Sequence, residues 1–360
     1  MTQQTRPAAD AQGPNYRTEL TQGEDRITYG EWAGGIPPRH AIAPRFRIGR
    51  DRWFNIMWLL PIGVVLALVG VAVAQWLRTL PAVQDFIATY PGVAITPQAE
   101  ANAGIPWWVN LQHFVNILFM LFIIRSGWQI LVDHPRLYWS RHSRPGREWV
   151  RVAPQAPDDP YWTAKQDSVD LPKNVGIPGL RHTIGLARWW HLTMDTGWLL
   201  NGVVFYVLIF TTGHWHRIVP TSWDVFPNAL STAIQYLSLD FPPEHAWVAY
   251  NGLQLLAYFV TVFVAAPLAM ITGLGMSPTL STRFGKFSKY FSIQLARSIH
   301  ALVMVWFVVF IVLHVSMVLV TGAVENLNIM FAARHSEGAL GVVIFGVALA
   351  IIIAAWLWAS

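Results

Sequence analysis

The sequence of 360 residues contains no cysteine. This absence excludes disulfide bonds, cysteine-bound iron–sulfur clusters and any cofactor attached through cysteine sulfur, so a metal would need histidine, methionine or oxygen ligands. Charged residues are also scarce, at 12% of the chain, which is about half the usual share in a soluble protein. No amino-terminal signal peptide is expected, because residues 1–52 are polar and the first apolar run begins at Trp53.

Apolar residues make up 54% of the chain, which includes 19 tryptophans, and the mean hydropathy is +0.37. Long apolar runs without strand-like alternation predict membrane-spanning helices, which satisfy their own backbone hydrogen bonds. We therefore predict an all-α membrane protein, with a polar tail at 1–52 and a transmembrane domain at 53–360. Each predicted span is near the ~20 residues needed to cross a bilayer. The spans are 53–77, 108–132, 189–211, 247–273, 294–321 and 339–358.

The distribution of basic residues predicts the orientation. Eight arginines lie in the tail, nine basic residues lie in the loop 133–188, and three more follow the fourth span. The alternate loops hold only Arg78, Arg217 and Arg334. Because basic loops stay on the cytoplasmic side, we expect a multi-pass protein of the bacterial inner membrane with both termini in the cytoplasm. The same basic loops are also candidates for docking an acidic partner.

Four histidines fall inside spans, where ionisable side chains are rare and usually functional. His300 and His314 share the fifth span and are 14 residues apart. In a helix this spacing is a rise of about 21 Å with both side chains on nearly one face. The predicted orientation places His113 level with His314 near the outer side and His191 level with His300 near the inner side. Two level pairs predict two haems stacked across the membrane, with His113 and His314 on the outer iron and His191 and His300 on the inner iron.

Other interpretations of these histidines stay open. A histidine in a span sometimes only bonds a neighbouring helix. His214 and His216, in a His-Trp-His segment, form a second candidate metal site, and His214 competes with His113 as the outer ligand. At the level of function, the rivals are a histidine-dependent proton or metal transporter and a haem-free membrane anchor.

Three arginines are candidate partners for haem propionates. Arg188 and Arg297 each lie three residues before an inner histidine, one helical turn nearer the cytoplasm. Arg125 lies in the second span, about 18 Å from His113 by helix rise. The alternative for Arg188 and Arg297 is that they are ordinary cytoplasmic-side residues whose long side chains reach the interface.

Asp195 and Trp190 are candidates for handling protons at a quinone site. Asp195 lies four residues after His191, one turn deeper in the third span. A structural ion pair, for example with Arg125, is the alternative role for this carboxylate.

Several motifs resemble the bacterial di-haem b-type cytochromes, the b561-like membrane subunits of formate dehydrogenases, nickel–iron hydrogenases and thiosulfate reductase-like enzymes. The fifth span carries His300 and His314 and is followed by Gly322 and the polar segment Glu325–Arg334, and the other motifs lie at Gln112–Asn116, Ser126–Ile130, His134–Trp139, Ala187–His191 and Trp198–Gly202. The resemblance implies a four-helix core, about 108–335, that holds two bis-histidine b haems with the pairing given above. Residues 53–77 and 339–358 are then extra helices outside this core.

The resemblance also implies electron transfer between a quinone pool and a partner catalytic subunit, expected to be of the molybdopterin type. We expect the loop 133–188, with the tail beside it, to form the docking surface, and we expect no nucleic-acid partner. An extra first helix inverts the core relative to the formate dehydrogenase subunit. Which haem faces the partner and which lies near the quinone therefore stays open.

Overall fold

The computed structural model describes residues 42–50, 52–93, 104–141, 146–153, 169, 184–241, 247–277, 291–336 and 338–358. Within these residues, six helices are long and apolar enough to cross a membrane. They are Ile56–Leu77, Trp107–Asp133, Ala187–Thr211, Gly252–Gly275, Ile293–Val320 and Leu340–Trp358. Their ends agree with the six predicted spans to within five residues. The prediction of an all-α membrane protein with six spans is confirmed.

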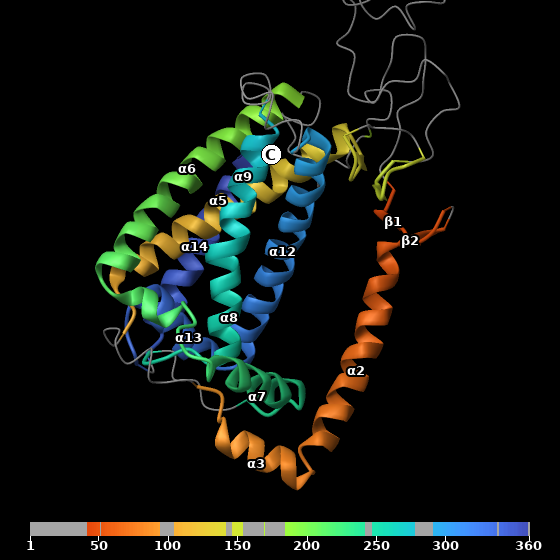
Figure 1. The fold of residues 1–360 in the computed structure, drawn as a ribbon. Helices are drawn as coiled ribbons and strands as arrows, with labels where there is room; N and C mark the ends of the chain where they lie inside the picture. Colours follow the sequence, from red (N-terminus) through yellow and green to blue (C-terminus); the bar gives the residue numbers. More distant parts are fainter. Residues whose placement is uncertain are drawn as a thin grey trace, which may run out of the picture. The chain divides into compact units, whose positions relative to one another are not determined.

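Figure 1 shows the helices as coiled ribbons along the chain. Their bounds are α2 Leu59–Leu77, α3 Pro81–Thr89, α5 Trp107–Asp133, α6 Ile184–Thr211, α7 Val225–Leu237, α8 Gly252–Phe259, α9 Ala266–Gly275, α12 Ile293–Val320, α13 Ala323–Ala332 and α14 Leu340–Trp358. Short 3-10 turns occur at Ile56–Trp58 (η1) and His214–Arg217 (η4). Span four is not uniform, because a π-helical segment, η5 (Val260–Ala265), joins α8 to α9.

The chain divides into two compact units. The first comprises Met1–Met57, Leu121–Met194 and Trp356–Ser360, and the second comprises Trp58–Met120 and Asp195–Ala355. Helices α5, α6 and α14 each pass from one unit to the other.

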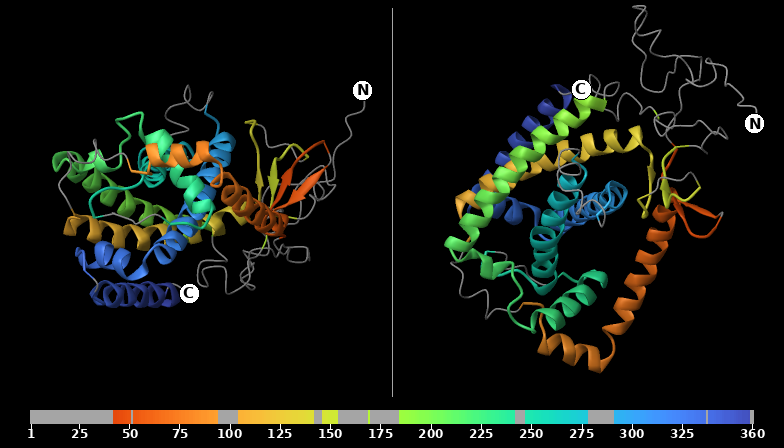
Figure 2. Two further views of the ribbon diagram at one scale, coloured as in Figure 1. Left: turned by 90° about the horizontal axis from the view of Figure 1, so that it is seen from below. Right: turned by 45° about the horizontal axis from the view of Figure 1, so that its top comes forward.

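The first unit contains a small antiparallel sheet of β1 (Arg45–Arg47), β2 (Trp53–Asn55), β3 (Arg136–Leu137) and β4 (Val150–Arg151). The strand order is β2-β1-β4-β3, and the strands lie side by side in Figure 2. The end of the predicted polar tail thus forms a strand, and the first three residues of the predicted first span pair with it. Val132, Ala153 and Val169 form a buried cluster in this unit.

In the second unit, α12 packs against α9 and η5, and α7 packs against α8. Hydrogen-bonded caps mark where two helices begin. The Asn251 side chain accepts from the Gln254 amide while the Gln254 side chain accepts from the Asn251 amide, which is a capping box at the start of α8. Ser292 accepts from the Leu295 amide at the start of α12.

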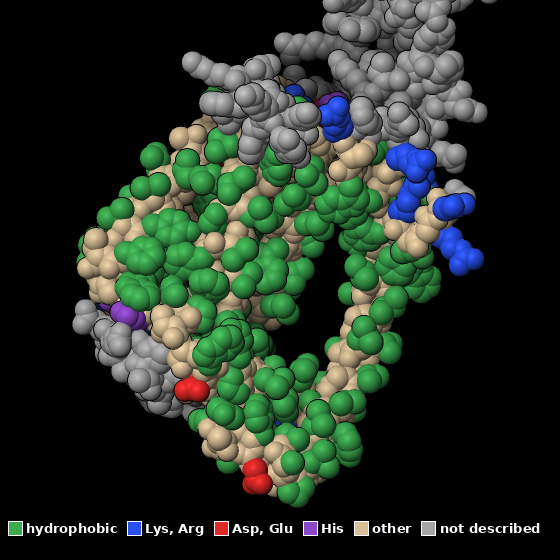
Figure 3. Space-filling view, viewed as in Figure 1, with side chains coloured by type: hydrophobic (Ala, Val, Ile, Leu, Met, Phe, Trp, Pro, Cys, Tyr) green, Lys and Arg blue, Asp and Glu red, His purple; other side chains and the backbone are tan. Residues whose placement is uncertain are grey.

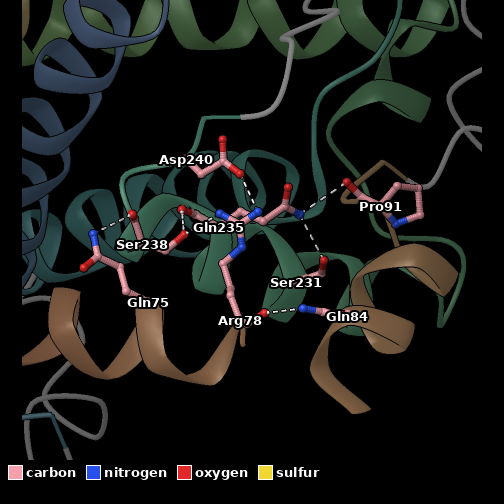
Figure 4. A network of polar contacts seen from close by, with 8 residues as sticks. All are labelled: Gln75, Arg78, Gln84, Pro91, Ser231, Gln235, Ser238 and Asp240. Atoms are coloured by element: carbon pink, nitrogen blue, oxygen red, sulfur yellow. Dashed lines mark hydrogen bonds and ion pairs between the residues drawn. The ribbon is translucent and has the colours of Figure 1, made fainter. Parts of the chain in front are cut away.

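Helix α2 belongs to this unit and makes its polar contacts at its carboxyl end. Arg78 forms an ion pair with Asp240 and donates to Ser238 Oγ at 2.9 Å, while Gln75 donates to the Ser238 carbonyl at 3.4 Å (Figure 4). Along its length, by contrast, α2 presents exposed apolar side chains such as Leu66, which is 64% exposed (Figure 3). Such a surface suits contact with lipid acyl chains.

Candidate functional site

His113 of α5 and His314 of α12 lie beside each other in the second unit. Their ring centroids are 6.2 Å apart and the ring planes meet at 68°. Two imidazoles that bind one metal ion have nitrogens about 4 Å apart and ring centroids about 6 Å apart, since each metal–nitrogen bond is about 2 Å. The observed separation therefore fits two axial ligands of one iron.

Aromatic side chains surround this pair of histidines. Phe310 stacks on His314 with ring planes 3° apart, and Tyr258 and Phe331 make edge contacts with His314 and His113. The Nδ1 atom of His113 is buried and has no hydrogen-bond partner among the described residues. An unpartnered buried nitrogen is costly in a closed core.

His191 of α6 is held by a hydroxyl group in the first unit. Its Nδ1 atom lies 2.8 Å from Ser126 Oγ. The same hydroxyl lies 2.8 Å from the Phe122 carbonyl and 3.1 Å from the Ile123 carbonyl of its own helix. A hydroxyl has one proton to donate, and the helix carbonyls take it, so Ser126 accepts the proton of Nδ1. The lone pair of His191 is then on Nε2, which is the form that binds a metal.

His300 of α12 has the same arrangement in the second unit. Its Nδ1 atom lies 2.9 Å from Thr272 Oγ1, and that hydroxyl lies 2.7 Å from the Leu268 carbonyl. The lone pair of His300 is therefore also on Nε2. Sequence reasoning gave neither Ser126 nor Thr272 a role. A hydroxyl in an apolar span is common, and only helix packing reveals which imidazole lies beside it.

The predicted propionate partners lie in three different surroundings. Arg125 is 6% exposed, donates to the Trp356 carbonyl at 3.1 Å and lies 4.0 Å from the centre of the Trp356 ring. Arg297 donates to Gln294 at 3.1 Å. Arg188 is exposed and makes no hydrogen bond or ion pair with the described residues. Sequence analysis placed the last helix outside the core and missed its contact with Arg125.

Trp190 and Asp195 both lie on α6. The indole Nε1 of Trp190 is buried without an acceptor among the described residues, and its ring packs against Phe122. Asp195 is half-buried. An indole N–H without a partner in an apolar span is available to an oxygen-bearing ligand.

His214 is buried at the end of span three, and its ring contacts are with Trp108 and Thr212. Burial, and then the charge of Arg217, lower the pKa of His214, although its hydrogen bond at Thr212 opposes this. His113, not His214, is the ring beside His314. In the part of the chain that the structure describes, no group of three or more His, Asp or Glu side chains forms a metal cluster.

Helices α5 and α6 approach closely in the second unit. A Cβ atom on Gly197 would lie 2.4 Å from the Phe119 ring, so only glycine fits at this crossing. One residue along, the Trp198 indole donates to Asn116 Oδ1 at 2.8 Å. These contacts fix the position of the α5 segment that carries His113.

Apolar spans that bring two histidine rings together, as His113 and His314 do, are typical of membrane proteins that hold a metal cofactor between their helices. The sequence profile of the prokaryotic cytochrome b561 family matches residues 104–333, which is more than half of the chain. The chain belongs to this family. It is a multi-pass membrane cytochrome b that binds haem b and transfers electrons. A transporter and a haem-free anchor do not match this family.

A protein from Azospira oryzae is 24% identical over 223 residues, which cover 61% of this chain and 91% of the relative. Its name describes it as a candidate protein-methionine-sulfoxide reductase subunit, YedZ1. No solved structure matches the chain significantly.

Proposed function

We propose that this cytochrome holds two haem b groups and carries electrons between the quinone pool and a catalytic oxidoreductase subunit. The observation that carries the proposal is the pair His113 and His314, whose ring centroids are 6.2 Å apart. At this separation His113 and His314 would be able to hold one haem iron between their rings. A haem supplies a reversible one-electron couple, and two histidine ligands leave no open position for oxygen.

The inner haem is assigned to His191 and His300. One support is that the two histidines have matching predicted depths. The other is that the Ser126 and Thr272 hydroxyls each accept from the Nδ1 of one ring, which leaves its Nε2 lone pair available to a metal. A metal-bound histidine usually passes its other N–H to such an acceptor, which orients the ring and raises its basicity. Both histidines lie on long continuous helices, so their rings are held by rigid elements.

The arginines are proposed to meet the propionates at the inner end. Arg125 is held by the end of α14 through Trp356, so its guanidinium is positioned before any ligand binds. Arg188 and Arg297 lie one turn on the cytoplasmic side of their histidines and suit the charged edge of a haem.

A quinone is proposed near the third span. The buried Trp190 N–H is a suitable donor to a quinone oxygen, and Asp195 is a carboxylate able to exchange its proton. A quinone needs protons as well as electrons when it is reduced, so a titratable group within the span supports this location.

The partner is proposed to be a catalytic oxidoreductase subunit of the molybdopterin type. The proposal is supported by the resemblance to subunits of such enzymes and by the relative named as a subunit of a methionine-sulfoxide reductase. The docking surface is assigned to the cytoplasmic loop 133–188 and the tail 1–52. Most of both segments lies outside the described residues.

Haem content tests the ligand assignment. The purified protein should show two b-type haems per chain in its reduced-minus-oxidised spectrum and by haem extraction. His314→Ala should remove one of them, and His300→Ala should remove the other, leaving two spectrally distinct single-haem variants. His214→Gln is the matched control, because it removes a nearby buried histidine that is proposed not to bind iron.

The outcomes separate the parts of the proposal. If His214→Gln lost one haem and His113→Ala kept both, the outer ligand would be His214 and not His113. A single haem in the unaltered protein would reduce the proposal to one site. Loss of the same haem in His300→Ala and His314→Ala would contradict two separate pairs.

A further inference from the structure

The small sheet of the first unit brings arginines of three strands into one row. Arg45 of β1 lies directly opposite Arg151 of β4, and Arg151 lies directly opposite Arg136 of β3. Residues directly opposite each other in neighbouring strands point to the same face, with Cβ atoms about 5 Å apart. Like charges in such positions destabilise a sheet. The row therefore calls for compensating negative charge.

The described residues supply little of that charge. Arg136 is paired with Glu148 at 2.8 Å, and both side chains are almost fully buried. Asp133, the other described carboxylate of this unit, lies 3.5 Å from His134 instead. The Nε atoms of Arg45, Arg47 and Arg151 are buried and have no hydrogen-bond acceptor among the described residues. Among the described residues, one carboxylate thus serves a face that carries four arginines.

An aromatic ring holds two of these arginines in place. The guanidinium carbon atoms of Arg151 and Arg47 lie 4.1 Å and 4.9 Å from the centre of the Trp53 ring. Stacking on an indole orients a guanidinium without neutralising its charge. Burial, and then the charge of Arg136, lower the pKa of Arg151, while Glu148 opposes this. The guanidinium groups of Arg47 and Arg151 are therefore preorganised, and no carboxylate among the described residues pairs with either of them.

The chain tethers this sheet to the membrane surface. Strand β3 begins three residues after α5 ends at Asp133, and β2 is followed at once by the span Ile56–Leu77. Three residues extend about 10 Å at most, so the strands lie within the depth of the lipid headgroups. Tryptophan is typical of that depth. Trp139, 48% exposed and stacked on Trp149 at 4.8 Å, lies beside the same strands.

We propose that Arg45, Arg47 and Arg151 form a binding site for the phosphate group of an anionic phospholipid. The forked guanidinium matches phosphate oxygens and makes paired, charge-assisted hydrogen bonds to them. Anionic lipids are the phosphate source that is always present at this depth of the cytoplasmic leaflet. Basic side chains gather over this sheet in Figure 3. The site shares no residue with the proposed haem ligands, so a negative result for the haem assignment would not contradict the proposed lipid site.

The test uses the full-length, haem-loaded protein in detergent. Phosphatidylglycerol, phosphatidylcholine or inorganic phosphate is titrated into it, and bound lipid is counted by native mass spectrometry. The unaltered protein should retain phosphatidylglycerol, at least tenfold more tightly than phosphatidylcholine, and millimolar inorganic phosphate should not displace it. Haem absorbance in each variant reports correct folding.

Two double variants remove equal charge. Arg45→Gln with Arg151→Gln should weaken phosphatidylglycerol binding at least tenfold, and the sheet should still form because the change removes facing like charges. Arg50→Gln with Arg52→Gln is the control, since both residues are exposed and lie outside the row. Arg45→Lys with Arg151→Lys should bind at an intermediate level, because charge is kept and the paired geometry is lost.

Three results would overturn the proposal. Equal loss in the two glutamine variants would indicate unspecific attraction to basic residues. Displacement of phosphatidylglycerol by millimolar inorganic phosphate would indicate that the site takes a soluble anion. Lipid binding unaffected by Arg45→Gln with Arg151→Gln, together with loss of a co-purified partner subunit in that variant, would indicate a protein interface.

Discussion

At the scale of single residues, hydroxyl groups decide how two of the span histidines are presented. Ser126 and Thr272 each give their proton to a carbonyl of their own helix and accept one from an imidazole. His113 has no such acceptor among the described residues. The proposed inner and outer ligands thus differ in their surroundings although all are histidines, and such a difference would give the two proposed haems different potentials.

We expect Thr272→Val to raise the midpoint potential of the inner haem by about 30 to 60 mV, because His300 becomes less basic when its acceptor is lost. Thr272→Ser keeps the hydroxyl and should leave the potential near that of the unaltered protein. A potentiometric titration of the haem absorbance measures both. A shift confined to the outer haem would contradict the assignment of His300.

His214 should contribute a loss of stability in acid. Burial and Arg217 lower its pKa in the folded protein, so the unfolded chain takes up the proton first and stability falls as the pH drops below about 6.5. His214→Gln removes this contribution. In thermal melts between pH 7.5 and 5.5, the Tm of the variant should therefore decrease less than the Tm of the unaltered protein. An equal decrease in both proteins would contradict the proposed contribution of His214.

At the scale of elements, the spans are set by apolar composition, but their contacts are set by a few small or polar residues. Span four contains the π-helical segment η5, whose Val262 carbonyl accepts from the Tyr206 hydroxyl at 2.5 Å. The Gly197 crossing is a second example, since the Phe119 ring occupies the space of a Cβ atom. Neither feature follows from hydropathy.

Gly197→Ala should therefore destabilise the packing of α5 on α6. The added methyl group meets Phe119 in a closed space, and such overpacking costs about 1 to 3 kcal/mol. Gly202→Ala is the matched control on the same helix, because nothing lies within 4 Å of its added Cβ atom. Thermal melts followed by haem absorbance compare the two, and an equal loss of Tm in both variants would contradict the close contact.

At the scale of the whole molecule, the basic loops predict that both termini are cytoplasmic. Since the chain has no cysteine, each introduced cysteine is a unique label site. Ser140 and Thr221 are both exposed and lie in loops on opposite predicted sides of the membrane. The two positions therefore test the orientation directly.

A membrane-impermeant maleimide should label Thr221→Cys in intact spheroplasts and should label Ser140→Cys only after the membrane is opened. The physical reason is the excess of basic residues in the loop 133–188, which resists translocation. The reverse pattern would invert the core, exchange the inner and outer haem labels and leave the histidine pairs unchanged.

The six spans and the four histidines inside them followed from the sequence alone. An apolar run near 20 residues has one stable form in a bilayer, and a fixed rise per residue converts spacing into depth. The contact of His113 with His314 was predicted in this way, and the structure places the two rings together.

Only the tertiary structure decided which side chains from different helices meet. The hydroxyl acceptors Ser126 and Thr272, the stacking of Arg125 on Trp356 and the arginine row of the sheet depend on helix rotation and strand register. The hydropathy of a segment predicts that it lies in lipid, but it does not change when the helix rotates about its axis. Hydropathy therefore does not reveal which side chains face a neighbouring helix. For this reason the sequence predicted which residues lie in the membrane and at what depth, and packing determined the partners of each.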